Sequence, residues 1–229
     1  MNLSDLRSVN RVPDSSFVAG VVLADGVAVS PSPEGLKSLM AALVQRRSGE
    51  EFPSAVKEAV RSLLKRGGFK PSGRNKPASE YLAQAAREGR FPFINNLVDV
   101  NNLLSLETGL PISLLDLRSF GTGSGTAPAA VLRYGTAGEK YVFNPAGQEI
   151  DLEGLLCVGS ERALLGNPVK DSMAGKLKDD TRAVLGVIYG TLDCEPGRGM
   201  AAHVERFAAL LKEFGGAGET KTSVLRLGP

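Results

Sequence analysis

The sequence predicts an α+β fold, in which a helical N-terminal part packs on a mixed or antiparallel β-sheet core. Apolar residues recur at helical spacing through most of the first half of the chain. From Leu114 onward they gather instead into short runs separated by Gly, Pro and Asn, a pattern typical of strands. Helices that come first and strands that follow favour α+β over a repeating β-α-β sheet. With 229 residues, 42% hydrophobic and 23% charged, the chain has the size and composition of one large globular domain.

The first half begins with a short β element and continues as four helices. The valine-rich segment 17–30 is interrupted by Asp25-Gly26, a pair that favours a tight hairpin turn. The first helix is expected after Ser32-Pro33, an N-cap followed by proline, and ends at Ser48-Gly49. The other three helices are expected from Pro53 to Gly67-Gly68, from near Pro77 to Gly89, and from about Asn95 to Glu107.

Four short apolar runs in the second half predict strands, and a last helical periodicity predicts a closing helix. The strands are expected at Ala129–Tyr134, Tyr141–Phe143, Leu155–Val158 and Val184–Tyr189. The helix is expected from about Met200 to Phe214, with a loose tail after Gly215-Gly216. We see no internal repeat and expect one domain over residues 1–229, made of a helical extension (1–92), a core (93–190) and a C-terminal helix and tail (191–229).

Composition excludes several classes of function. The formal net charge of +2 argues against a uniformly basic nucleic-acid coat protein, so any nucleic-acid contact needs a local patch. Two cysteines, Cys157 and Cys194, and one histidine, His203, support neither a disulfide scaffold nor a metal site nor a triad that requires histidine. We expect core cysteines and an exposed or locally bonded histidine. The chain has no apolar stretch of signal-peptide or membrane-spanning type, which predicts a cytoplasmic protein without membrane contact.

One local charge imbalance stands out in the helical part. Residues 61–90 contain 8 Lys or Arg and 2 Asp or Glu, a balance of +6. At its centre is a loop whose basic residues are Arg66, Lys70, Arg74 and Lys76, with Phe69 among them. Such cations neutralise phosphates and an exposed aromatic ring stacks on bases, so the loop is a candidate RNA contact. The alternative is an ordinary solvated connector between two helices.

Two familiar catalytic motifs are absent. The glycine-rich segment from Gly121 to Gly125 lacks the Gly-Lys-Ser/Thr of a phosphate-binding loop, and Pro128 leads into a strand-like run instead of a helix. We therefore expect a flexible hairpin tip there. No serine occupies a Gly-x-Ser-x-Gly elbow.

Asn102 is a polar residue on an apolar stripe of the fourth helix, four residues from both Val98 and Leu106. A buried amide without a partner costs about 1–3 kcal/mol, so its amide should be hydrogen-bonded. Either it ties the helix to the following strand or it faces a polar pocket.

An ordered series of short motifs resembles a known family. They are Leu97-Val-Asp-Val-Asn-Asn102, Glu107-Thr-Gly-Leu-Pro111, Asp116-Leu117, Gly138-Glu139, the segment Tyr141–Ile150, Asp151-Leu-Glu-Gly-Leu-Leu156 and Lys178-Asp-Asp-Thr-Arg-Ala-Val184. Over about residues 93–190 the chain resembles the B3/B4 tRNA-editing domain of the phenylalanyl-tRNA synthetase beta subunit. The helical start resembles the extra region of free-standing members.

The resemblance implies an α+β domain whose pocket receives the aminoacylated 3′ end of a tRNA and hydrolyses the ester of a misattached amino acid. By position, Asn102 and Thr181 match the family's asparagine and threonine, and the segment from Gly166 to Pro168 replaces a glycine-rich pocket wall. Ser113 and Met173 stand where the synthetase domain has a pocket histidine and glutamate. The run Lys170-Asp171-Ser172 resembles what free-standing members carry, with a plain surface turn as the alternative.

An activated ester needs positioned water and a stabilised oxyanion more than a strong nucleophile. In this scheme backbone N–H groups around Gly166-Asn167 form the oxyanion hole and Lys170 adds positive charge. Asp171 captures the α-amino group, and Asn167 or Ser172 holds the water. The candidate catalytic residues are thus Lys170, Asp171 and Asn167, with no cofactor and no metal.

The leading hypothesis is a free-standing aminoacyl-tRNA deacylase that acts in trans. One alternative is a non-catalytic tRNA- or RNA-binding module of the same fold, which Ser113 and Met173 would support. Another is a small-molecule hydrolase or amino-acid-binding protein that uses the pocket without tRNA. The sequence leaves the amino acid, the tRNA and the oligomeric state open.

Overall fold

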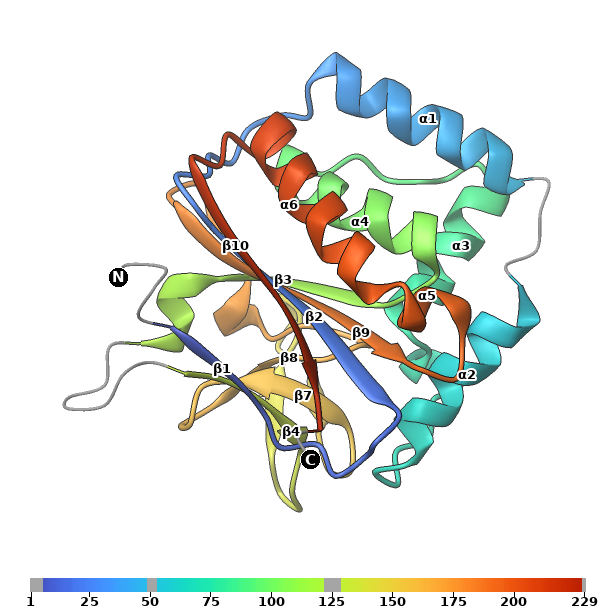
Figure 1. Cartoon of the computed structure of the whole chain (residues 1–229), viewed down its shortest axis with the longest axis vertical. Helices are drawn as coiled ribbons and strands as arrows, with labels where there is room; N and C mark the ends of the chain where they lie inside the picture. Colours follow the sequence, from blue (N-terminus) through green and yellow to red (C-terminus); the bar gives the residue numbers. More distant parts are fainter. Residues whose placement is uncertain (1–5, 49–52, 122–128, 228–229) are drawn as a thin grey trace.

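The computed structural model describes residues 6–48, 53–121 and 129–227. Figure 1 shows three layers: a layer of helices, a sheet beneath it, and a second sheet below the first. The helices are α1 (Glu34–Ser48), α2 (Ser54–Lys65), α3 (Ala78–Arg87), α4 (Asn96–Thr108), α5 (Glu195–Arg198) and α6 (Met200–Gly215). Short 3₁₀ turns form at Gly73–Asn75, Leu117–Phe120 and Met173–Gly175. The α+β class and the four N-terminal helices predicted from the sequence are confirmed.

The central sheet has the strand order β10-β2-β9-β3 and is antiparallel throughout. Its strands are β2 (Phe17–Asp25), β3 (Ile112–Asp116), β9 (Ala183–Thr191) and β10 (Glu219–Arg226). The two long inner strands are almost entirely buried because both of their faces are covered, which explains their continuous apolar sequence. In register, Ser113 of β3 lies opposite Val187 of β9.

The second sheet has the order β1-β4-β7-β8, with β1 parallel to β4 and the other pairs antiparallel. Its strands are β1 (Arg7–Asn10), β4 (Ala129–Tyr134), β7 (Leu156–Gly159) and β8 (Leu164–Gly166). A separate hairpin joins β5 (Lys140–Val142) to β6 (Glu149–Asp151). The mixed and antiparallel sheet core expected from the sequence is therefore present.

Two hydrophobic cores lie on the two faces of the central sheet. Alternate residues of β2 and β9, such as Val22 and Ile188, belong to the core beneath the helices, where α6 contacts β2 and α4 contacts β3. The intervening residues, such as Val21 and Val187, face the second sheet. Helix α2 reaches both cores, with Val60 in the first and Leu64 in the second. The basic loop (residues 66–76) follows α2 and therefore begins beside the second core, between the two sheets.

Two expectations, one about the segment after β2 and one about the tail after α6, were wrong. Asp25-Gly26 makes a turn, with Gly26 at φ +77°, but the chain continues to α1 instead of returning as a hairpin strand. The tail after Gly216 is not loose, because β10 pairs with β2 from Val18 to Asp25. The glycine-rich tip expected at Gly121 to Gly125 lies, beyond Gly121 itself, outside the described residues.

Candidate functional site

A tight turn after β8 carries most of the candidate catalytic residues. The Asn167 side chain shapes it: its Oδ1 accepts hydrogen bonds from the backbone N–H groups of Val169 and Lys170, both at 2.8 Å. Its Nδ2 donates to the hydroxyl of Tyr141, which in turn donates to the carbonyl of Lys170 at 2.7 Å. The Asn167 amide thus makes three hydrogen bonds inside the turn, where it positions its neighbours.

The carboxylate of Asp171 is anchored through one oxygen. Its Oδ1 accepts from the Ser113 hydroxyl at 2.6 Å and from the Asn167 backbone N–H at 3.1 Å. The Ser113 hydroxyl also lies 2.9 Å from the hydroxyl of Tyr189. Oδ2 has no hydrogen-bond partner among the described residues. We call Ser113, Tyr141, Asn167, Asp171 and Tyr189 the polar cluster.

Burial sets the protonation chemistry of the polar cluster. It raises the pKa of Asp171 to about 7, although the hydrogen bonds from Ser113 and Asn167 favour the ionised form. Burial also raises the pKa values of Tyr141 and Tyr189, so both hydroxyls stay protonated. Asp171 is therefore a carboxyl group that exchanges its proton near neutral pH.

Gly166 allows the polar cluster to close. A Cβ at this position would lie 2.9 Å from Asp171 Oδ1, 3.0 Å from Ser113 Oγ and 3.1 Å from Leu115 Cδ1. Any side chain there would push the carboxyl and the hydroxyl away from the strand.

Lys170 leaves the same turn toward an open cleft of about 610 Å³. Its Nζ lies 4.3 Å from the centre of the Phe143 ring, a cation–π contact. Burial, and then the positive charge of Arg74, lower the pKa of Lys170. The other lining residues belong to the basic loop and to the region of β6; they are Gly67, Gly68, Phe69, Lys70, Asn75, Glu149, Ile150, Asp151 and Glu153.

The basic loop supplies three unpaired cations near this cleft. The side chains of Lys70, Arg74 and Lys76 form no hydrogen bond or ion pair with any part of the chain that the structure describes. Arg66 differs, because its guanidinium is held by Asp14 and Asp193, at 2.7 and 2.6 Å. The start of α3, directly after the loop, is joined to the turn by a hydrogen bond from the Ala78 N–H to the Pro168 carbonyl, at 2.8 Å.

Four residues expected in the pocket have other surroundings. The Ser172 hydroxyl accepts from the Ala174 N–H and caps the 3₁₀ turn that Met173 begins. Thr181 donates to Asp116 at 2.6 Å, in a separate network with Arg118. Asn102 lies in the helical layer, on the opposite face of the central sheet from Ser113. The structure therefore brings together Ser113, Gly166, Asn167, Lys170 and Asp171, but neither Asn102 nor Thr181.

The hydrogen bonds that join α4 to its surroundings do not come from Asn102, in contrast to our expectation. Its amide makes no hydrogen bond within the described part of the chain. Asn96 fastens the start of the helix instead, by accepting from the Ser30 N–H and donating to the carbonyls of Ala28 and Phe214. At the other end, Ser105 donates to the Leu110 carbonyl at 2.8 Å.

The expected oxyanion hole is not available at the Asn167 N–H. The Asn167 N–H donates to Asp171, and the N–H groups of Val169 and Lys170 donate to the Asn167 side chain. The Lys170 ammonium remains as a cation at the cleft, whose lining also holds Lys70 and the carboxylates of Glu149, Asp151 and Glu153.

Sequence reasoning missed Tyr141, Phe143 and Tyr189. Both tyrosines stand in apolar strand segments, where an aromatic residue predicts packing and nothing more. A tyrosine hydroxyl in a buried strand needs a polar partner, and this was the one available signal.

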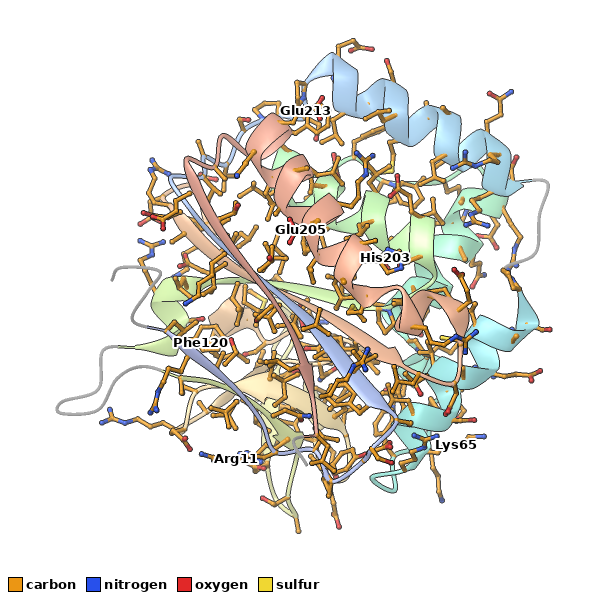
Figure 2. All side chains as sticks on the ribbon, in the orientation of Figure 1. Arg11, Lys65, Phe120, His203, Glu205 and Glu213 are labelled. Atoms are coloured by element: carbon orange, nitrogen blue, oxygen red, sulfur yellow. The ribbon has the colours of Figure 1, made fainter. Side chains whose placement is uncertain are left out.

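Other residues singled out from the sequence lie away from the polar cluster or are buried. Figure 2 shows His203 in the helical layer, on α6, where burial lowers its pKa. Cys157 and Cys194 are free and buried. Across residues 6–48, 53–121 and 129–227, no three His, Cys, Asp or Glu side chains gather as a metal site would require. No helix in these ranges has the length and apolar character needed to cross a bilayer.

Replacing Ser113 with alanine is expected to raise the pKa of Asp171 above 7, because the lost hydrogen bond favours the ionised carboxylate. The pKa can be followed by NMR titration of ¹³C-labelled aspartate carboxyl groups. Ser119→Ala is the control, since the Ser119 hydroxyl bonds the Asp116 carbonyl elsewhere. An unchanged or lower pKa of Asp171 in Ser113→Ala would contradict the assigned hydrogen bond.

Comparison with known proteins identifies the family. The sequence model described as the B3/4 domain matches residues 69–191, more than half of the chain. The chain belongs to the B3/4 domain family. The match includes the basic loop from Phe69 onward and the whole polar cluster, and it confirms the resemblance drawn from residues 93–190.

Two relatives of the B3/4 protein are phenylalanine–tRNA ligase beta subunits. That of Clostridium tetani is 28% identical over 108 residues, which are 46% of this chain and 13% of the relative. That of Carboxydothermus hydrogenoformans is 28% identical over 109 residues, 47% of this chain and 13% of the relative. The chain thus spans only a small part of these relatives.

A solved N-terminal fragment of the Pyrococcus horikoshii phenylalanyl-tRNA synthetase beta subunit aligns with 87% of the B3/4 protein and 49% of its own chain. The identity is 13% and the TM-score is 0.39.

Proposed function

We propose that this B3/4 protein is an aminoacyl-tRNA deacylase, which hydrolyses the ester of a misattached amino acid at a tRNA 3′ end. The observation that supports it is the turn in which Lys170 and Asp171 are neighbours, placed against the basic loop in the family's matched region. Two phenylalanine–tRNA ligase beta subunits are among the relatives of this chain.

The basic loop supplies contacts for the RNA in this proposal. Lys70, Arg74 and Lys76 are unpaired among the described residues and would neutralise phosphates of the terminal nucleotides. Phe69 lines the cleft and offers a ring on which a base can stack. Arg66 has no part in binding, because its charge is already matched by two carboxylates.

Lys170 and Asp171 supply the chemistry. A carboxyl group with a pKa of about 7 is well matched to accept a proton from an attacking water at neutral pH, and its Oδ2 is free to do so. The Lys170 ammonium would stabilise the negative charge that develops on the ester carbonyl oxygen. Asn167 and Tyr141 act as positioning residues, since they hold the turn and touch no reacting atom.

The test is release of amino acid from a panel of correctly and incorrectly charged tRNAs. We expect release above the uncatalysed rate for at least one mischarged tRNA, and at least a tenfold slower rate for Lys170→Gln. Lys212→Gln on α6 is the matched control, because Lys212 is exposed in the helical layer. No release from any charged tRNA would refute the deacylase, and an unchanged rate for Lys170→Gln would refute the role of that residue.

A non-catalytic RNA-binding module is the second candidate. It is favoured by the engagement of Asn167, the Asn167 N–H and Ser113 in internal hydrogen bonds. Saturable tRNA binding without hydrolysis would support it. In that case the Lys70→Gln/Arg74→Gln variant should weaken binding and reduce the slope of log affinity against log salt by about 1–2.

A further inference from the structure

A second cavity, of about 180 Å³, lies between α2 and α3 and shares no lining residue with the polar cluster or the cleft. Three apolar side chains, Val56, Val60 and Ala83, form one wall and belong to the helical core. Ser79 is on the neighbouring turn of α3, and Gly109 closes one end. An engineered cavity of about 150 Å³ is large enough to bind benzene, so this one accommodates a small organic molecule.

Ser79 marks the cavity as a site for a polar group. Only 4% of this residue is exposed, and its hydroxyl forms no hydrogen bond within the described residues. The Ser79 oxygen is not one of the fully enclosed side-chain atoms that lack a partner, so it is open to the cavity, where it can form a hydrogen bond with a ligand. No side chain caps the first turn of α2 either, which leaves backbone donors at the Ser54 end of the cavity.

The charge of the cavity is positive. Lys57 and Arg87 line it and form no ion pair with the residues described here. The acidic lining residue, Glu80, is already neutralised by two hydrogen bonds from Arg61, at 2.6 and 2.7 Å. Two free cations, a free hydroxyl and an uncapped helix start therefore surround an apolar wall.

We propose that the cavity between α2 and α3 binds a small monocarboxylate with an apolar body, the carboxylate meeting Lys57, Arg87 and Ser79 and the body packing on Val56, Val60 and Ala83. A strongly hydrated anion such as phosphate would leave the apolar wall in contact with water. A neutral analogue would leave the two cations unmatched. α2 precedes the matched family region, whereas the lining residues from Ser79 to Gly109 fall within it. None of the lining residues belongs to the polar cluster or the cleft, so the proposal does not rest on the proposed deacylase.

The probe is 3-methylbutanoate, titrated into the full-length ¹⁵N-labelled protein and followed by ¹H–¹⁵N NMR. We expect saturable shifts confined to α2 and α3, with at least tenfold weaker binding of 3-methylbutanamide and of inorganic phosphate. Lys57→Gln, Arg87→Gln and Ser79→Ala should each weaken 3-methylbutanoate binding, the first two by about tenfold.

Lys65→Gln is the matched control, because Lys65 lies at the other end of α2 (Figure 2) and does not line the cavity. It should bind as the wild type does. Absence of saturable shifts, equal binding of the amide or phosphate, or variants that bind as tightly as Lys65→Gln would each overturn the proposal.

Discussion

Replacing Asp171 with asparagine is expected to stabilise the protein at pH 8 and to slow the proposed ester hydrolysis at least tenfold. Burial raises the pKa of Asp171 from the usual 3.8 to about 7. Between these values the unfolded chain loses the proton while the folded protein keeps it, so stability falls as the pH rises through this window. Above pH 7 the folded protein bears the full free-energy cost of holding the ionised Asp171 carboxylate. Asparagine removes it and still accepts hydrogen bonds from Ser113 and the Asn167 N–H.

The gain is expected to be about 1–2 kcal/mol, after allowance for the partial exposure of Asp171 to water. Urea unfolding at pH 4.5 and pH 8 measures it. At pH 4.5 most of the difference should vanish, because the wild-type carboxyl group is then protonated in the folded protein. The lost rate follows from removal of the proton acceptor.

Asp180→Asn is the matched control. The hydrogen bonds from Arg118 lower the pKa of Asp180 to about 2, so its ionised form is favoured in the folded protein. Asp180→Asn should be neutral or slightly destabilising at pH 8, opposite in sign to Asp171→Asn. A loss of stability at pH 8 in Asp171→Asn, or an equal gain at both pH values, would show that the ionised Asp171 carboxylate does not destabilise the folded protein.

The helices α1 to α4 and α6 and the two inner strands β2 and β9 could be predicted because local patterns determine them. Proline, asparagine and glycine mark the ends of α2, α3 and α4. The hairpin expected at Asp25-Gly26 does not form, because the chain turns at Gly26 and continues to α1 without a returning strand. β10 could not be predicted because its eight residues gain their partner from β2, almost two hundred residues earlier in the sequence.

The candidate site could be predicted in part. The family resemblance points to Ser113 and to residues 166–171, and the structure brings these together. The sequence could not separate Asn102 from these residues, because a helical stripe does not reveal which face of the sheet the helix covers. Tyr141 and Tyr189 were missed because their hydroxyls find partners only when the two sheets pack.

The cleft depends on close contact between the basic loop and the turn after β6. Gly67 and Gly154 approach backbone to backbone, and a Cβ on either residue would overlap the carbonyl oxygen of the other. Gly154 also has φ +67°, which disfavours other residues. This contact fixes the start of the loop against the second sheet, so Phe69 and Lys70 are placed beside Lys170 by the absence of two side chains.

Replacing Gly67 with alanine is therefore expected to destabilise the protein by about 2–3 kcal/mol and to weaken tRNA binding. The new methyl group would meet the Gly154 carbonyl and, at 2.5 Å, the Tyr134 ring. Backbone cannot rotate away as a flexible side chain does, so the loop must move and carry Lys70 with it. Urea unfolding measures the first effect and a tRNA-binding titration measures the second.

Gly68→Ala separates this contact from simple backbone strain. Gly68 has φ +96° and nothing within 4 Å of a Cβ position, so alanine there should cost only about 1–2 kcal/mol and leave the loop in place. Gly154→Ala should resemble Gly67→Ala, since it meets the same contact from the other side. If Gly67→Ala and Gly68→Ala were equally stable and bound tRNA equally, the loop would not be held by this glycine contact, and the basic residues would reach the cleft by another route.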